Sequence, residues 1–206
     1  MTLLSFLDYA SVIVFAITGA LVASRAQLDL VGFAFIASLT AVGGGTVRDL
    51  LLDRNPIFWI EQPAYLGAAG AAAFITFFSA HLFESRLRAI IWLDSLALAV
   101  AVAAGAGVAI SLDQGPTIVM LMGVVTGCMG GLMRDVVVGD VPVVLKQGEL
   151  YVTAAFAGAA TTVLLKTFLP DVPYDLLIGA AATWVLRAGS IQFGWHLPVY
   201  KSTPKT

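Results

Sequence analysis

Two arginine-aspartate pairs lie inside apolar stretches of the chain. Arg48-Asp49 and Arg134-Asp135 each follow a group of glycines within one helical turn. A charge at the centre of a bilayer costs about 2.5–3.5 kcal/mol even on a lenient scale, so such side chains face a cavity or a partner. Adjacent helical residues point about 100° apart. We therefore expect crossed pairing, Arg48 near Asp135 and Arg134 near Asp49; the alternative is that both pairs reach the membrane surface from helix ends.

The glycines before these pairs are expected to interrupt their helices. The first group is Gly43, Gly44 and Gly45, and the second is Gly127, Gly130 and Gly131. Each glycine is about 1 kcal/mol less favourable than alanine inside a helix. We predict a break or kink at each group, where freed backbone groups face a permeating ion. Close packing of helices through small residues is the alternative. Candidate pore-lining hydroxyls are Ser38, Thr40, Thr46 and Thr126.

The surrounding composition indicates a membrane protein. Hydrophobic residues make up 59% of the 206 residues, and charged residues make up 12%. A typical soluble domain is about 45–50% hydrophobic and about 25% charged. Apolar runs of spanning length predict seven transmembrane helices in one domain. They lie near residues 5–23, 31–52, 64–83, 89–110, 117–138, 150–169 and 175–193.

An internal repeat organises these spans. Shifting the sequence by 86 positions aligns both Arg-Asp pairs, both glycine groups and Pro56 with Pro142, without a gap. We expect an all-α membrane protein with repeat one at about 5–85, repeat two at about 89–170 and a seventh helix at about 174–194. Three spans per half is an odd number, so the halves must have opposite orientations, related by a pseudo-two-fold axis in the membrane plane.

Basic residues favour an outside N-terminus and a cytoplasmic C-terminus in the inner (plasma) membrane. With this orientation the inner connections and tail hold Arg25, Arg86, Arg88, Lys146, Lys201 and Lys205, and the outer ones hold Arg54 and Lys166. Asp8 and Asp94 lie near the predicted starts of the first and fourth spans. A carboxylate there complements the helix dipole, so capping is their expected role and pore lining is the alternative.

Several classes of function find no support in the motifs. Nucleophile-elbow, zinc-protease and phosphate-loop patterns are absent, so we expect no enzyme. His81 and His196 have no matching partners, and no metal site is expected. The few charges sit in short connections and form no patch suited to nucleic acid.

The motif Gly-Gly-Gly-Thr-Val-Arg-Asp at 43–49, with Gly-Gly-Leu-Met-Arg-Asp-Val at 130–136, resembles the prokaryotic trimeric intracellular cation (TRIC) channel family. The resemblance covers essentially the whole chain. It implies a homotrimer among membrane lipids, with a pore in each protomer for potassium and also sodium, lined by glycine-kinked second and fifth helices. No cofactor is implied beyond the permeating ions and an optional bound lipid.

Two other functions stay open. Bacterial relatives are also called glycine transporters, and an inverted repeat around a midplane site suits both activities. The candidate lining residues are small and hydroxylated and offer no anchor for both ends of a zwitterion, which favours the channel. A structural or lipid-binding scaffold would leave the cost of the buried charges unexplained. Unpaired arginines would oppose cation flux, so we expect them to be paired, or displaced by a lipid or a gate movement.

Overall fold

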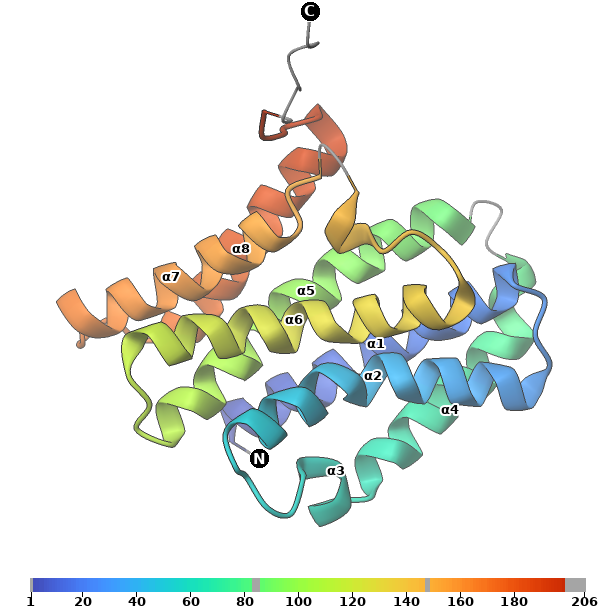
Figure 1. Cartoon of the computed structure of the whole chain (residues 1–206), viewed down its shortest axis with the longest axis horizontal. Helices are drawn as coiled ribbons and strands as arrows, with labels where there is room; N and C mark the ends of the chain where they lie inside the picture. Colours follow the sequence, from blue (N-terminus) through green and yellow to red (C-terminus); the bar gives the residue numbers. More distant parts are fainter. Residues whose placement is uncertain (1, 83–85, 147–148, 199–206) are drawn as a thin grey trace, which may run out of the picture.

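The computed structural model describes residues 2–82, 86–146 and 149–198, and within them the chain is entirely helical (Figure 1). The long helices are α1 (Leu3–Arg25), α2 (Leu30–Leu51), α4 (Ala64–Ser79), α5 (Arg86–Ser111), α6 (Pro116–Val138), α7 (Val152–Phe168) and α8 (Asp175–Phe193). Short elements lie between them: α3 (Phe58–Glu61), η1 (Ala80–Leu82) and η2 (Val143–Leu145). Lys201 and Lys205 of the tail lie outside the described residues.

Six helices in the described part of the chain are long and apolar enough to cross a membrane. α7 matches the sixth predicted span but has only 17 residues, so the count of seven spans stays a prediction. The third predicted span comprises α4 and the η1 turn together, Ala64–Leu82. The sequence analysis missed α3 and η2, because single helical turns carry no readable hydrophobic period.

Local side chains set where the core helices begin and end. Thr2 precedes α1, and its hydroxyl accepts the Ser5 N–H at 3.2 Å. Asp29 precedes α2 and accepts the Gly32 N–H at 2.8 Å. Pro116 occupies the first turn of α6, where its missing N–H leaves no bond unmade. α6 ends at Gly139, whose φ of 78° suits glycine.

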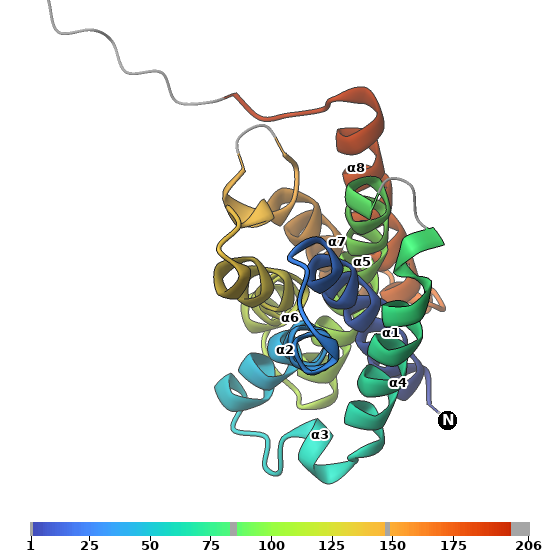
Figure 2. The same ribbon diagram turned by 90° about the vertical axis from the view of Figure 1, so that its right-hand side faces the viewer.

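The helices of the two halves correspond along the chain. Adding 86 to the bounds of α1 and α2 gives 89–111 and 116–137, close to α5 (Arg86–Ser111) and α6 (Pro116–Val138). In Figure 1, α1 and α5 run in opposite directions, and so do α2 and α6. Figure 2 shows α2 and α6 nearly end-on, with α4 on one side and α7 and α8 on another.

The glycine groups do not interrupt their helices, so a break, one of the two forms predicted, is wrong, and a kink at each group stays a prediction. α2 runs unbroken through Gly43, Gly44 and Gly45, and α6 through Gly127, Gly130 and Gly131. These glycines instead let α2 and α6 approach each other. A Cβ added at Gly44 would lie 2.1 Å from the carbonyl oxygen of Thr126, and one added at Gly130 would lie 2.4 Å from that of Thr40. Helix packing through small residues accounts for this contact.

Gly19 and Gly105 also allow neighbouring helices to pack closely. A Cβ at Gly19 would lie 2.6 Å from the Thr40 hydroxyl, and one at Gly105 would lie 2.4 Å from that of Thr126. These two contacts join α1 to α2 and α5 to α6 at equivalent positions of the two halves. The four core helices are therefore closely packed around a common centre.

Candidate functional site

Cluster one consists of Asp8, Arg48 and Asp49, all buried. Arg48 is completely covered; its Nε donates to Asp49 Oδ1 at 2.7 Å and its Nη1 to Asp8 Oδ1 at 3.1 Å. The guanidinium carbon lies 5.4 Å from the centre of the Phe58 ring. One arginine of α2 thus bridges a neighbouring carboxylate and a carboxylate of α1.

Cluster two consists of Asp94, Arg134 and Asp135 and has the same design. Arg134 is 1% exposed; its Nη1 donates to Asp94 Oδ1 at 2.8 Å and its Nε to Asp135 Oδ1 at 2.8 Å. The Thr18 hydroxyl of α1 accepts a further bond from Nη1 at 3.3 Å. Asp94 and Asp135 stand 86 positions after Asp8 and Asp49, so the two clusters are built from equivalent residues.

The expected crossed pairing is wrong, because each arginine pairs within its own half. Arg48 binds Asp49 and Arg134 binds Asp135 although adjacent helical residues diverge by about 100°. The long arginine side chain overcomes that divergence: Nε reaches the adjacent carboxylate while the end of the guanidinium fork reaches a second one. The alternative of surface exposure also fails, since both guanidinium groups are buried.

Asp8 and Asp94 are not helix caps. α1 begins at Leu3 behind the Thr2 cap and α5 begins at Arg86, so both aspartates lie more than a turn inside their helices. Each is the second carboxylate of a buried arginine. The expectation of capping was wrong because the helices begin earlier than their apolar runs.

The connections after α2 and α6 are fastened to the clusters. Asp49 Oδ2 accepts the Phe58 N–H of α3 at 2.9 Å, and Asp135 Oδ2 accepts the Val143 N–H of η2 at 3.0 Å. The Trp59 indole also donates to the Thr46 hydroxyl at 2.9 Å. Each aspartate thereby joins an arginine to the segment that covers its end of the molecule.

Cavities border both clusters at opposite ends of the core. The N-side cavity, about 300 Å³, lies at the start of α1 and is lined by Asp8, Arg54, Glu61 and Tyr65 among others. The C-side cavity, about 50 Å³, lies at the end of α1 and is lined by Asp94, Arg134, Asp135 and Arg187 among others. Since α1 has 23 residues, about 34 Å separate its two ends.

A central cavity lies next to the N-side cavity, between the core helices. Asp8 and Phe58 line both, and Arg48, Gly44 and Thr126 border the central one. Its volume is about 10 Å³, about the minimum needed to hold one water molecule. The space between cluster one and the α2–α6 contact is therefore much smaller than the N-side cavity.

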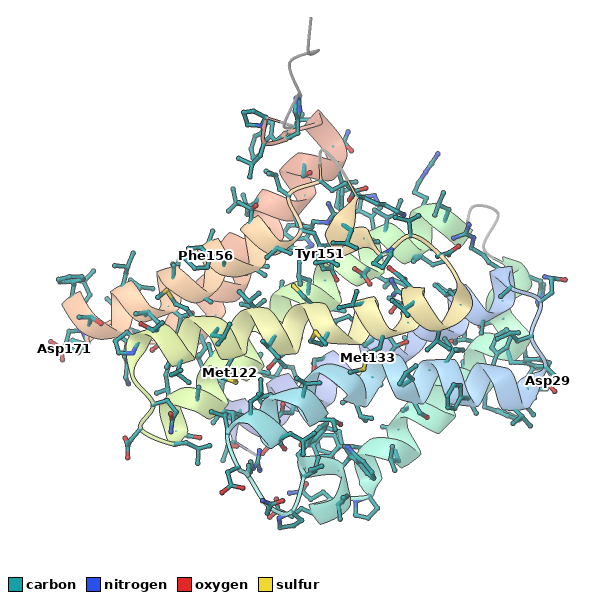
Figure 3. The ribbon with its side chains drawn as sticks, viewed as in Figure 1. Asp29, Met122, Met133, Tyr151, Phe156 and Asp171 are labelled. Carbon is teal, nitrogen blue, oxygen red and sulfur yellow. The ribbon has the colours of Figure 1, made fainter. Side chains whose placement is uncertain are left out.

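The candidate lining hydroxyls lie in different environments. Thr126 borders the central cavity and donates to the Met122 carbonyl at 2.6 Å. Thr40 is completely buried and donates to the Ile36 carbonyl, while Thr46 accepts from Trp59. Ser38 is half-buried on α2. On the facing helix, Met133 approaches Gly43 on the side of α6 that faces α2 (Figure 3).

The structure adds charged residues that the sequence analysis did not single out. Arg187 of α8 is 2% exposed and binds Glu149 at the C-side cavity. Arg54 binds Glu61 at 3.5 Å beside the N-side cavity. The signal for Arg187 was present, because an arginine inside an apolar span is rare and marks a function by default.

Among the described residues, no group of three histidine, cysteine or acidic side chains is placed to hold a metal ion.

Comparison with known proteins identifies the family. A family model described as Glycine transporter matches residues 5–81 and again 91–167, two segments offset by 86 positions. The structure of the TRIC trimeric intracellular cation channel orthologue from Rhodobacter sphaeroides is 43% identical and superposes with a TM-score of 0.90, covering 94% of this chain and all of that one. The chain belongs to the TRIC family. The resemblance carried by the two glycine-arginine-aspartate motifs is thus confirmed.

Other relatives match this TRIC-family chain over most of their length. A structure described for conductance through TRIC cation channels is 27% identical with a TM-score of 0.85, covering 99% of this chain and 100% of that chain. The inner membrane protein YadS of Escherichia coli K12 is 35% identical, covering 95% of this chain and 94% of the relative. A membrane protein of Vibrio cholerae is also 35% identical, over 98% of this chain and 84% of the relative. This TRIC-family chain is accordingly an all-helical membrane protein.

Proposed function

We propose that the chain is a monovalent cation channel, for potassium and also sodium, that works as a homotrimer with a pore in each protomer. The observation that carries this proposal is the pair of buried Arg-Asp clusters, each bordering a cavity at one end of the four core helices. The solved relatives with TM-scores of 0.90 and 0.85 are described as cation channels, which supports the same function.

The proposed path runs between α1, α2, α5 and α6. It leads from the N-side cavity past Asp8 and Arg48, along the glycine-rich contact of α2 with α6, and past Arg134 to the C-side cavity. In the present conformation this path is closed, because the central cavity has about 10 Å³ and both arginines sit in ion pairs. Opening requires each guanidinium to move aside.

The proposed topology has seven membrane-crossing helices, with α7 as the short one, and two inverted repeats followed by α8. The N-terminus faces outside and the C-terminus the cytoplasm. In this orientation the cytoplasmic face holds Arg25, Arg88 and Lys146, and the outer face holds Arg54 and Lys166. The cell inner membrane is the proposed location, as the name of the relative YadS indicates for that protein.

Planar-bilayer recording in asymmetric potassium chloride tests the function. We expect unitary currents from the purified protein that reverse near the potassium equilibrium potential. A transporter alternates its access to each side and gives no unitary currents. Absence of such currents, together with saturable uptake of labelled glycine into vesicles holding the same protein, would replace the channel by the carrier.

A further inference from the structure

α8, the helix outside the duplication, places a charged side chain beside cluster two. The Arg187 guanidinium is buried, and its Nη2 is paired with Glu149 Oε2. Its Nε and Nη1 have no hydrogen-bond partner among the described residues. The guanidinium carbon also lies 5.3 Å from the centre of the Tyr151 ring. Arg187 thus contacts two residues of the connection between α6 and α7.

The corresponding connection in the first half is held by a cation of its own. Arg54 lies in the α2–α3 connection and binds Glu61 at 3.5 Å, with its Nη1 3.9 Å from Asp49 Oδ1. Adding 86 to position 54 gives Asp140, a residue of opposite charge that borders the C-side cavity. The second half therefore has no cation at the position equivalent to Arg54, and Arg187 of α8 supplies one at the same cavity.

We propose that Arg187 is a positioning residue that fastens the α6–α7 connection over cluster two, as Arg54 fastens the α2–α4 connection over cluster one. Three contacts support this assignment. Glu149 is held by Arg187, the Leu150 N–H donates to the Ser190 hydroxyl of α8 at 3.1 Å, and the Val143 N–H binds Asp135 of cluster two. Figure 3 shows Tyr151 at this connection, at the start of α7.

The proposal rests on the channel function and adds a role for α8 to it. Asp135 binds Arg134 with one oxygen and is positioned by the Val143 N–H at the other, so releasing the connection leaves the carboxylate free to turn away from Arg134. Breaking the Arg187–Glu149 pair should then favour the open state. The change in open probability should follow loss of the Arg187–Glu149 ion pair, whichever of the two charges is removed.

Single-channel recording of three variants distinguishes the effect of losing the ion pair from the effect of changing the net charge. Arg187→Gln and Glu149→Gln change the net charge in opposite directions, yet each should raise the open probability, by about fivefold, the shift expected for one partly buried ion pair. The double variant Arg187→Glu with Glu149→Arg should return the open probability toward the wild-type value. Unchanged gating in both single variants, or opposite shifts in them, would overturn the proposal.

A second readout does not depend on conduction. In a Cys128→Ala background, a cysteine at Val143 should react with a thiol reagent faster when Arg187→Gln is added, because Val143 lies in the connection and lines the C-side cavity. Equal reaction rates would count against the fastening role. If the wild type gives no unitary currents but Val143→Cys still becomes more reactive, the channel function fails while the positioning role stands.

Discussion

Gly44 of α2 and Thr126 of α6 lie in direct backbone contact, because a Cβ at Gly44 would stand 2.1 Å from the Thr126 carbonyl oxygen. Gly130 of α6 and Thr40 of α2 form the reciprocal contact at 2.4 Å. The two helices that carry the buried arginines are therefore held at a distance that only glycine permits. Arg48 follows Gly44, and Arg134 follows Gly130, by about one helical turn, so both clusters lie next to this contact.

Gly44→Ala should push α2 and α6 apart and destabilise the protein by roughly 1–3 kcal/mol, the usual cost of overpacking. Gly70→Ala in α4 is the matched control, since a Cβ there meets nothing within 4 Å. Thermal unfolding in detergent measures both. Equal melting temperatures for the two variants would contradict the packing role of Gly44. Gly130→Ala should behave like Gly44→Ala, and both should depress conduction.

Asp94→Asn should leave Arg134 with one charged partner fewer in a buried site. Removing one member of a buried ion pair typically costs about 3–5 kcal/mol. Asp8→Asn should cost less, because the Asp8 side chain is 12% exposed and that of Asp94 is 4% exposed. Unfolding temperatures at constant pH check this order. Asp29→Asn is the control, since Asp29 is exposed and asparagine is an equally good helix cap; a loss there as large as at Asp94 would argue against the buried pair.

Arg134→Lys should keep the charge but lose the bridge, because an ammonium lacks the planar fork that joins Asp94 to Asp135. We expect a higher open probability with cation selectivity retained. Arg134→Ala should alter open probability or selectivity more strongly, while light scattering still detects trimers. Currents identical to the wild type from normally assembled Arg134→Ala protein would refute a gating role for this residue.

The proposed topology predicts which face each connection reaches. In a Cys128→Ala background, Gln114→Cys on the α5–α6 connection should react with a membrane-impermeant thiol reagent in intact cells. Leu28→Cys on the α1–α2 connection should react only after the cells are opened. Both positions are exposed. The reverse pattern would invert the proposed orientation.

The sequence was sufficient to predict the helices and their pairing between halves. Apolar runs of spanning length mark α1, α2, α5 and α6 within a few residues, because a bilayer leaves few alternatives to a hydrogen-bonded helix. The gapless alignment of one Arg-Asp pair with the other indicated an internal duplication. The family model matches the chain twice at the same offset of 86 positions. These features depend on local composition and order, which a single sequence contains.

The partners of the buried charges could not be read in this way. Arg48 reaches Asp8 across 40 positions, and Arg187 reaches Glu149 across 38, so both pairings depend on how helices dock. The glycine groups were ambiguous for a related reason: a residue without a side chain suits both a helix interruption and a close contact. Only the position of the neighbouring backbone, such as the Thr126 carbonyl beside Gly44, decides between the two.

Arg48 and Arg134 are each neutralised by aspartates of their own half, at opposite ends of α1. In the proposed channel, a stimulus that acts on one face would therefore open one end and leave the other shut. Under the proposed channel function, conduction requires coincidence: the fraction of time the whole path is open is the product of two separate occupancies. The membrane leaks little even when either end opens often by itself.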